Sequence, residues 1–301
     1  MDTRLKTDLA GIELKNPIIM ASGTYGFGEE FKNYYSPEIL GGISSKGITR
    51  FPKPGNTGIR IWETPSGILN SIGLENPGVE EFVKEKLHDM NELGTKVFVN
   101  LGGNTVEEYV ESVEILNDYD FDAIELNISC PNVKEGGMAF GMEKDSAANV
   151  VKKVMAKTNK KVFVKLSPNA GDLVGIAKAV EAEGATGISL INTILGMAID
   201  VDREEVVFDN TYAGLSGPAV KPIALRMVNQ VAKNVNIPII GMGGITNYRD
   251  VLEFLMAGAT AVQVGTYNFM NPEGPKEIIE DLEKFLESKN KTVADYVKKL
   301  V

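Results

Sequence analysis

The sequence predicts one α/β domain over residues 1–301, folded as a TIM (β/α)8 barrel, and three observations support this. Short apolar runs recur along the chain, and a longer amphipathic segment follows each of them. The runs are apolar throughout rather than alternating, which is typical of parallel strands buried on both faces. The length of 301 residues also lies within the usual range of such barrels.

Eight apolar runs are the expected barrel strands. They cover residues 17–21, 42–46, 97–101, 123–127, 162–166, 187–193, 239–244 and 261–266. The steps that follow Lys46, Asn127 and Thr193 are longer than the others, and the surplus precedes the helix. It therefore belongs to strand-to-helix loops, which lie on the face where barrel enzymes keep their active sites. We expect these loops to form a roof over one pocket.

The two ends of the chain are predicted to add small elements to the barrel. Residues 7–17, TDLAGIELKNP, resemble a hairpin with Ala10 and Gly11 at its turn, which we expect to plug the barrel from below. Residues 292–301 are predicted to form an extra helix capped by Thr292. The one histidine, His88, lies in a charged helical pattern and is expected on a helix surface.

Composition argues against several classes of protein. The net charge of −10 opposes nucleic-acid binding, which draws on Lys and Arg. One cysteine and one histidine leave no internal disulfide, no cysteine-ligated iron–sulfur cluster and no multi-histidine metal site. The sequence has no apolar run of membrane-spanning length and no apolar signal core, so a cytoplasmic protein is expected. The absence of a G-x-G-x-x-G after a strand argues against an NAD site on this chain.

The predicted strands end in polar residues rather than in apolar core residues. Asn100, Asn127 and Lys165 close three of them, and such side chains are seldom buried without partners. Their convergence on one face predicts a polar ligand. The last two strands end in glycine pairs or Gly-Thr, which favours a phosphate on exposed backbone N–H groups, although these glycines could simply permit tight turns.

Lys165 and Lys46 are candidates for binding anionic groups. A buried ammonium needs a negative or electron-rich partner, and a flavin fits because its reduced form gains negative charge. The alternative for Lys165 is an ion pair with Glu125 on the preceding strand. Lys46 could hold the carboxylate of a substrate.

The single cysteine, Cys130, follows a strand end and precedes Pro131, which holds its backbone extended. A lone cysteine is commonly a buried structural residue. Its place in a glycine-bearing loop over a polar mouth instead favours a functional thiol. An unperturbed pKa of ~8.5 suits a general base near neutral pH, and no histidine is expected nearby to make it a nucleophile.

The sequence resembles the class 1 dihydroorotate dehydrogenases, most closely the class 1B catalytic subunits, over nearly its whole length. The resemblance rests on MASGTYGFG, SSKGIT, LNSIGLENPG, VNLGGNT, ELNISCPNVKEGG, VKLSPN, INT, GLSGPAVKPIALR, GMGGI and VGT. It implies FMN on the barrel mouth, with Cys130 as the base that deprotonates dihydroorotate. The implied FMN contacts are Ser22, Lys46, Gly47, Asn100, Asn127, Lys165, Ile191, Gly217, Gly243, Gly244, Gly265 and Thr266. The implied substrate contacts are Lys46, Asn70, Ser71, Ile72, Gly73, Leu74, Asn127, Asn132, Asn192 and Thr193.

The resemblance also implies partners that this chain lacks. A second subunit with FAD and a [2Fe–2S] cluster would pass electrons to NAD+, within a heterotetramer built on a homodimer. Three alternatives remain open at this point. They are a class 1A homodimer that reduces fumarate, a flavin-dependent tRNA dihydrouridine synthase, and a phosphate-binding barrel without catalytic activity.

Overall fold

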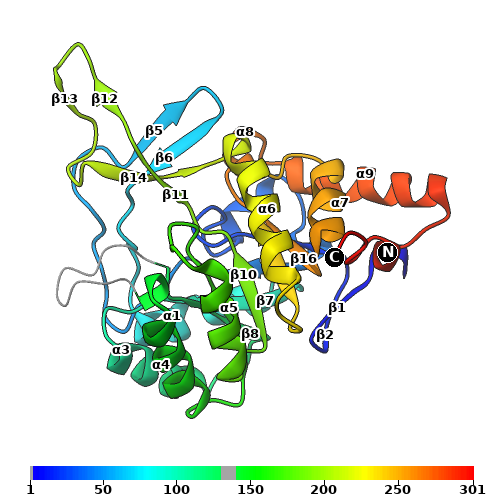
Figure 1. Cartoon of the computed structure of the whole chain (residues 1–301), viewed down its shortest axis with the longest axis horizontal. Helices are drawn as coiled ribbons and strands as arrows, with labels where there is room; N and C mark the ends of the chain where they lie inside the picture. The colour runs from blue at the N-terminus through cyan, green and yellow to red at the C-terminus, as the bar shows by residue number, and fades with distance from the viewer. Residues whose placement is uncertain (1–2, 130–139) are drawn as a thin grey trace.

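The computed structural model describes residues 3–129 and 140–301, and it contains a closed barrel of eight parallel strands (Figure 1). The barrel strands are β3 (Ile18–Met20), β4 (Gly42–Ser44), β7 (Lys96–Leu101), β8 (Ala123–Asn127), β9 (Lys161–Lys165), β10 (Gly187–Leu190), β15 (Ile239–Met242) and β16 (Ala261–Val264). Each lies within or one residue beside a predicted apolar run. The prediction of a (β/α)8 barrel is therefore confirmed.

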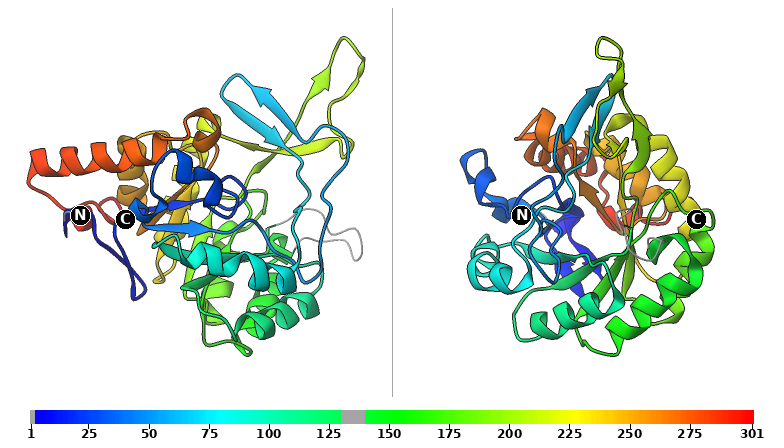
Figure 2. Two further views of the ribbon diagram at one scale, coloured as in Figure 1. Left: turned by 180° about the vertical axis from the view of Figure 1, so that it is seen from behind. Right: turned by 90° about the vertical axis from the view of Figure 1, so that its left-hand side faces the viewer.

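Helices surround the barrel, as the view in the right half of Figure 2 shows. They are α1 (Val79–Glu85), α2 (Leu87–Asn91), α3 (Val106–Leu116), α4 (Lys144–Met155), α5 (Leu173–Ala182), α6 (Lys221–Ala232), α7 (Tyr248–Ala257), α8 (Tyr267–Met270) and α9 (Gly274–Lys289). Side chains cap several of them: Thr105 accepts from the Glu108 N–H at the start of α3. His88 is exposed on α2, as predicted. None of the helices in the described residues has the length and apolar character to cross a bilayer.

The barrel interior is filled in layers contributed by alternate strands. The lowest layer has small residues on β4, β8, β10 and β16, and above it lie large residues on the four strands between them. The two layers are Gly42, Ala123, Gly187 and Ala261, and then Ile19, Phe98, Phe163 and Ile240. Small residues are needed below because a Cβ on Gly187 would lie 2.4 Å from the Phe163 ring. The interior is therefore close-packed at its base.

The predicted N-terminal hairpin closes the bottom of the barrel. It consists of β1 (Thr7–Leu9) and β2 (Ile12–Leu14), paired antiparallel, with Ala10 and Gly11 at positive φ in its turn. Leu9, Ile12 and Leu14 pack into the same cluster as Phe98 and Phe163. The plug prediction is confirmed, and the apolar base leaves the upper end of the barrel for polar groups.

Two of the long loops combine into an antiparallel sheet above the barrel (Figures 1 and 2). Its strands, in spatial order, are β11 (Ile194–Met197), β14 (Tyr212–Ser216), β6 (Gly67–Asn70) and β5 (Ile61–Thr64). The short hairpin of β12 (Ile199–Asp200) and β13 (Glu205–Val206) extends from it, at the top left of Figure 1. The sequence predicted a roof here, but not that segments so distant in sequence pair as strands.

The prediction of a C-terminal helix is wrong. Thr292 does cap a turn, through a capping box with Asp295, but only a 3-10 turn follows it (Val293–Asp295). Beyond it the N–H of Lys298 donates to Leu255 O and that of Leu300 to Met256 O. The last residues therefore satisfy carbonyl groups at the end of α7, and a continued helix would leave those groups without these donors.

Candidate active site

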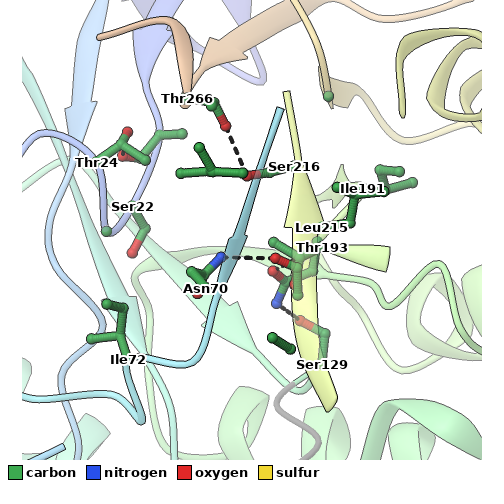
Figure 3. Close-up of a pocket in the computed structure, with 18 of the residues that line it drawn as sticks. Ser22, Thr24, Asn70, Ile72, Ser129, Ile191, Thr193, Leu215, Ser216 and Thr266 are labelled. Carbon is green, nitrogen blue, oxygen red and sulfur yellow. Dashed lines mark hydrogen bonds between the residues drawn. The ribbon is translucent and has the colours of Figure 1, made fainter. Parts of the chain in front are cut away.

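A cavity of about 520 Å3 lies between the barrel mouth and the roof sheet (Figure 3). Most of the residues that the sequence singled out line this one cavity. They are Ser22, Lys46, Gly47, Asn70, Ser71, Ile72, Gly73, Leu74, Asn127, Lys165, Ile191, Asn192, Thr193, Gly217, Gly243, Gly244, Gly265 and Thr266. They come from the ends of seven barrel strands and from the roof, so the fold brings together residues that lie more than 200 positions apart in the sequence.

Three of the predicted site residues do not line the cavity in the described structure. Asn100 lies one step deeper and is fully buried. It accepts a hydrogen bond from Asn127 Nδ2 at 3.3 Å and donates to Glu125 Oε2 at 2.5 Å, so it supports lining residues from below. Cys130 and Asn132 lie outside the described residues, and their roles stay predictions.

Glu125 forms the centre of a polar layer directly below the cavity. It is fully buried and accepts hydrogen bonds from Ser44 Oγ at 2.9 Å, Asn100 Nδ2 at 2.5 Å and Gln263 Nε2 at 2.8 Å. Burial alone would raise the pKa of Glu125, but Lys165 and these hydrogen bonds outweigh it and leave the pKa lowered. The floor of the cavity therefore contains a carboxylate anion.

Lys165 lies above this anion and faces the cavity. Its side chain is 6% exposed, and its Nζ is 3.7 Å from Glu125 Oε2, so the ion pair considered from the sequence is present. This contact is too long for a hydrogen bond. Among the described residues, none accepts a hydrogen bond from the ammonium, so its donors remain available to a group in the cavity.

Gln263 provides a second unsatisfied atom at the floor. Its Nε2 donates to Glu125, and its Oε1 is buried without a hydrogen-bond partner in the described part of the chain. Buried acceptors are nearly always paired in native proteins, so this oxygen indicates a missing donor. Sequence reasoning missed Gln263 because it lies within a strand, and only strand ends were considered.

Glycines make the opposite end of the cavity narrow and expose backbone there. Gly217 and Gly244 both have positive φ, and a Cβ on Gly244 would lie 2.8 Å from Gly217 O. A Cβ on Gly217 would lie 2.6 Å from Gly67 Cα. Thr266 Oγ1 donates to Ser216 Oγ at 2.8 Å beside them (Figure 3). Close backbone segments with a hydroxyl pair suit a phosphate.

Amide and hydroxyl groups form the wall between these two ends. Asn192 Nδ2 donates to Ser129 Oγ at 2.6 Å, the dashed line at Ser129 in Figure 3. Ser129 Oγ in turn donates to Asn127 Oδ1 at 2.7 Å. Asn70 Nδ2 donates to Gly214 O at 3.2 Å, which fixes it under the roof. Ser129 was missed from the sequence, although it directly precedes Cys130.

The donor set fits a flavin mononucleotide. The glycine-rich end suits its phosphate. The N–H groups of Lys165 and Oε1 of Gln263, which have no hydrogen-bond partner among the described residues, suit the acceptors and the N–H of a flavin ring. The remaining amides suit a second flat ring with amide edges. No group of three or more metal-binding side chains occurs in residues 3–129 and 140–301.

Comparisons with known proteins agree with this geometry. The profile of the family described as Dihydroorotate dehydrogenase matches residues 4–286. A protein of Petrotoga mobilis named dihydroorotate dehydrogenase B (NAD(+)), catalytic subunit, is 51% identical over 98% of this chain and 99% of its own. Proteins of the same name from Thermoanaerobacter pseudethanolicus and Desulforamulus reducens are 50% and 53% identical, over 94% and 95% of this chain and 93% and 94% of their own.

Proposed function

Because the chain belongs to the dihydroorotate dehydrogenase family, we propose that it oxidises dihydroorotate to orotate in pyrimidine biosynthesis, in the cytoplasm. The chain is an oxidoreductase by this membership. The observation that carries the more specific proposal is the cavity floor, where a buried ammonium and a buried amide oxygen lack hydrogen-bond partners in the described structure.

FMN is the proposed cofactor, and when bound it supplies a hydride acceptor. Gly217, Gly243, Gly244, Gly265 and Thr266 would hold its phosphate. Lys165 would donate to the flavin ring and stabilise the negative charge that the ring gains on reduction. Ser22, Lys46, Gly47, Asn100, Asn127 and Ile191 complete the proposed set, with Asn100 acting through Asn127 and Glu125.

Dihydroorotate would lie on the flavin, under the roof sheet. Lys46 Nζ has no hydrogen bond or ion pair in the described structure, which leaves it available for the substrate carboxylate. Asn70, Asn127, Asn192 and Thr193 would bind the amide edges of the ring, since an asparagine offers both a donor and an acceptor. The loop Ser71, Ile72, Gly73 and Leu74 would close over it, and Asn132 is a further proposed contact.

Cys130 is the proposed base. Its thiolate would take the proton from C5 of the substrate while a hydride leaves C6, which converts the ring to orotate. Cys130 lies one residue beyond Ser129, whose hydroxyl is held by Asn127 and Asn192 in the cavity wall. Ser129, the last described residue before Cys130, therefore lies in the cavity wall, which supports this proposal.

The electrons then have to leave the chain. The relatives carry the words NAD(+) and catalytic subunit in their name, which favours NAD+ over fumarate as acceptor and indicates a partner. We propose that this partner holds FAD and a [2Fe–2S] cluster and that two copies of this chain form the core of a heterotetramer. Thus the class 1A and dihydrouridine synthase alternatives receive no support from the comparisons.

The visible spectrum of the purified chain tests the proposal. We expect a yellow protein whose flavin absorbance is bleached by dihydroorotate without oxygen, and no NADH from the chain alone. A colourless protein after incubation with FMN, or a flavin that dihydroorotate leaves oxidised, would contradict it.

Replacement of the proposed base separates chemistry from binding. Cys130→Ala should retain FMN and bind orotate, but reduce its flavin with dihydroorotate at least about a hundredfold more slowly at pH 7, because a general base contributes on the order of 10²–10⁴-fold. Stopped-flow measurement of flavin bleaching checks this. An unchanged rate would remove Cys130 from the mechanism.

A further inference from the structure

The polar layer beneath the cavity is built by four alternate strands of the barrel. β4, β8, β10 and β16 contribute Ser44, Glu125, Ser189 and Gln263, and each is at most 1% exposed. β8 and β16 lie opposite each other in the barrel order, so the bond from Gln263 to Glu125 crosses the interior. A barrel layer at this depth normally holds branched apolar side chains. This one holds an anion that accepts hydrogen bonds from Ser44 and Gln263 of the same layer and from Asn100 on β7.

The position of Glu125 relative to Lys165 is specific. Three neutral groups hold the carboxylate at 2.5–2.9 Å, and Lys165 Nζ lies outside hydrogen-bond distance at 3.7 Å. The carboxylate therefore supplies charge to the lysine without occupying its donors. Since Lys165 is nearly buried, an ammonium there without a counter-charge would lose its proton readily.

We infer that Glu125 is a positioning residue that keeps Lys165 protonated at the cavity floor while leaving its N–H groups free for the flavin. The inference rests on the proposed FMN site and goes beyond it, because Glu125 does not line the cavity. Glu125 supplies the charge balance, and Ser44, Asn100 and Gln263 fix its carboxylate.

Other ionisable groups near Lys165 are few. Its strand β9 pairs with β8, which contributes Glu125 and Asn127, and with β10, which contributes Ser189. In the described part of the cavity wall, Lys46 is the other charged side chain and Tyr212 is a titratable one at the exposed rim. Neither supplies a negative charge near neutral pH, so Glu125 is the counter-charge.

The number of protons taken up on flavin reduction tests this inference. In the unaltered protein with FMN bound, Lys165 is protonated before and after reduction, so two electrons should bring one proton, to the flavin itself. In Glu125→Gln, Lys165 should be neutral while the flavin is oxidised and regain its proton when the flavin becomes anionic. Two protons per two electrons are then expected, read from the slope of midpoint potential against pH between pH 7 and 9.5.

A matched variant separates charge from fit. Glu125→Asp keeps the negative charge but shortens the side chain, whereas Glu125→Gln keeps the length of the side chain but removes the charge. We expect the Glu125→Asp variant to take up one proton per two electrons, as the unaltered protein does. The inference is overturned if the Glu125→Gln variant also takes up one proton, or if both variants take up the same larger number.

The potential is measured with dyes and an electrode rather than with dihydroorotate, so a wrong substrate would not affect the result. Absence of bound flavin in the unaltered protein would refute the proposed function instead. If Glu125→Gln does not fold well enough for potentiometry, the double variant Glu125→Gln/Lys165→Met provides a second test. Its melting temperature should recover by several degrees over the single variant, because it removes a buried amine that has lost its counter-charge. A melting temperature no higher than that of the single variant would overturn the inferred pairing of Glu125 with Lys165.

Discussion

The two lysines of the cavity have different surroundings, and these surroundings assign them different partners. Lys165 lies at the floor above the anion of Glu125. Lys46 is half-buried at the end of β4, and no described residue forms a hydrogen bond or ion pair with it. Glu125 therefore lies directly beside one cation, whereas the other attracts Glu75 only at a distance, with no hydrogen bond or ion pair, and its ammonium remains available to an anion in the cavity. This difference favours Lys46 for the carboxylate of the substrate.

Loss of the Lys46 ammonium should weaken binding of the product. We expect Lys46→Met to raise the Kd for orotate about ten- to a hundredfold, since a hydrogen bond to a charged group is worth ~1.5–3 kcal/mol. Titration of the oxidised flavin spectrum with orotate measures it. Lys53→Met is the control, because Lys53 Nζ binds Asn104 at 2.8 Å and does not line the cavity. An equal rise of the Kd for orotate in both variants would refute a specific role of Lys46 in binding the carboxylate.

At the scale of elements, the loop after β9 holds the loop after β10 in place. Asn169 Nδ2 donates to Thr193 O at 3.1 Å, and the Leu195 N–H donates to Asn169 Oδ1 at 3.0 Å. Both contacts lie where β11 leaves the barrel to join the roof. Asn169 thus sets the position of Thr193 against the cavity, although the sequence analysis did not select it.

Loss of the two hydrogen bonds of Asn169 should weaken the binding of the substrate site to its ligand more than the binding of the cofactor. We expect Asn169→Ala to raise the Kd for orotate about threefold to thirtyfold and to leave the Kd for FMN within twofold, because two neutral hydrogen bonds are lost at ~1 kcal/mol each. Equilibrium titrations of the apoprotein with FMN and of the flavoprotein with orotate check both. A loss confined to FMN affinity would contradict the assignment.

A salt bridge ties α6 to α7 behind the glycine-rich end of the cavity. Lys221 Nζ lies 2.6 Å from Asp250 Oδ1 and 2.9 Å from Glu253 Oε2, and Asp250 also accepts from the Thr246 N–H at 2.8 Å. Partial burial would lower the pKa of Lys221, but its bonds to Asp250 and Glu253 outweigh this and raise it. The group thus orders the turn that follows Gly243 and Gly244.

The raised pKa gives this bridge a defined pH dependence. A raised folded-state pKa adds stability that is complete below the unfolded value of ~10.4 and falls as pH rises through the folded value. Lys221→Met should therefore lower the free energy of unfolding by ~1–2 kcal/mol at pH 8, and the difference should narrow above pH 10.5. Urea unfolding at several pH values measures it. A constant difference would show that packing rather than charge is lost.

Sequence patterns predicted the elements whose signal is local. Each apolar run became a barrel strand, because a strand buried on both faces must be apolar along its length. The roof sheet was not predicted, since its pairing of Asn70 with Gly214 depends on contacts across more than 140 residues. The C-terminal helix was predicted wrongly because the carbonyl groups of α7 compete for its N–H groups, which no local pattern reveals.

The candidate site divides in the same way. Lys46, Asn127 and Lys165 could be selected because polar residues at the ends of apolar strands are conspicuous, and parallel strands bring their ends together. The sequence indicated Glu125 only as an ion-pair partner of Lys165, and it did not indicate Gln263, because their contact depends on two strands that face each other across the barrel interior. The role of a charged residue within a strand cannot be inferred from the sequence, because it depends on the side chains that the residue contacts in the folded protein.

At the scale of the whole molecule, the β12–β13 hairpin projects beyond the roof sheet (Figure 1). Each strand has two residues, and the hairpin exposes Ile199 at 60% and Val201 at 79%. The roof sheet from which it extends also exposes Trp62 and Met197, which do not line the cavity. A short isolated hairpin is marginal in water, and apolar residues gathered on one projecting feature indicate a contact surface. The hairpin is thus the part of the chain best suited to the proposed homodimer.

A charge placed on the hairpin tests this assignment. In a symmetric dimer the same patch occurs on both copies, so Ile199→Glu puts two desolvated carboxylates into the interface. We expect the dimer dissociation constant to rise at least tenfold and monomers to predominate at micromolar concentration in light scattering. Leu300→Glu is the control, since Leu300 is equally exposed, at 61%, beside the barrel end that lies away from the hairpin (Figure 1). Dimers that survive Ile199→Glu but not Leu300→Glu would place the interface at the other end of the barrel.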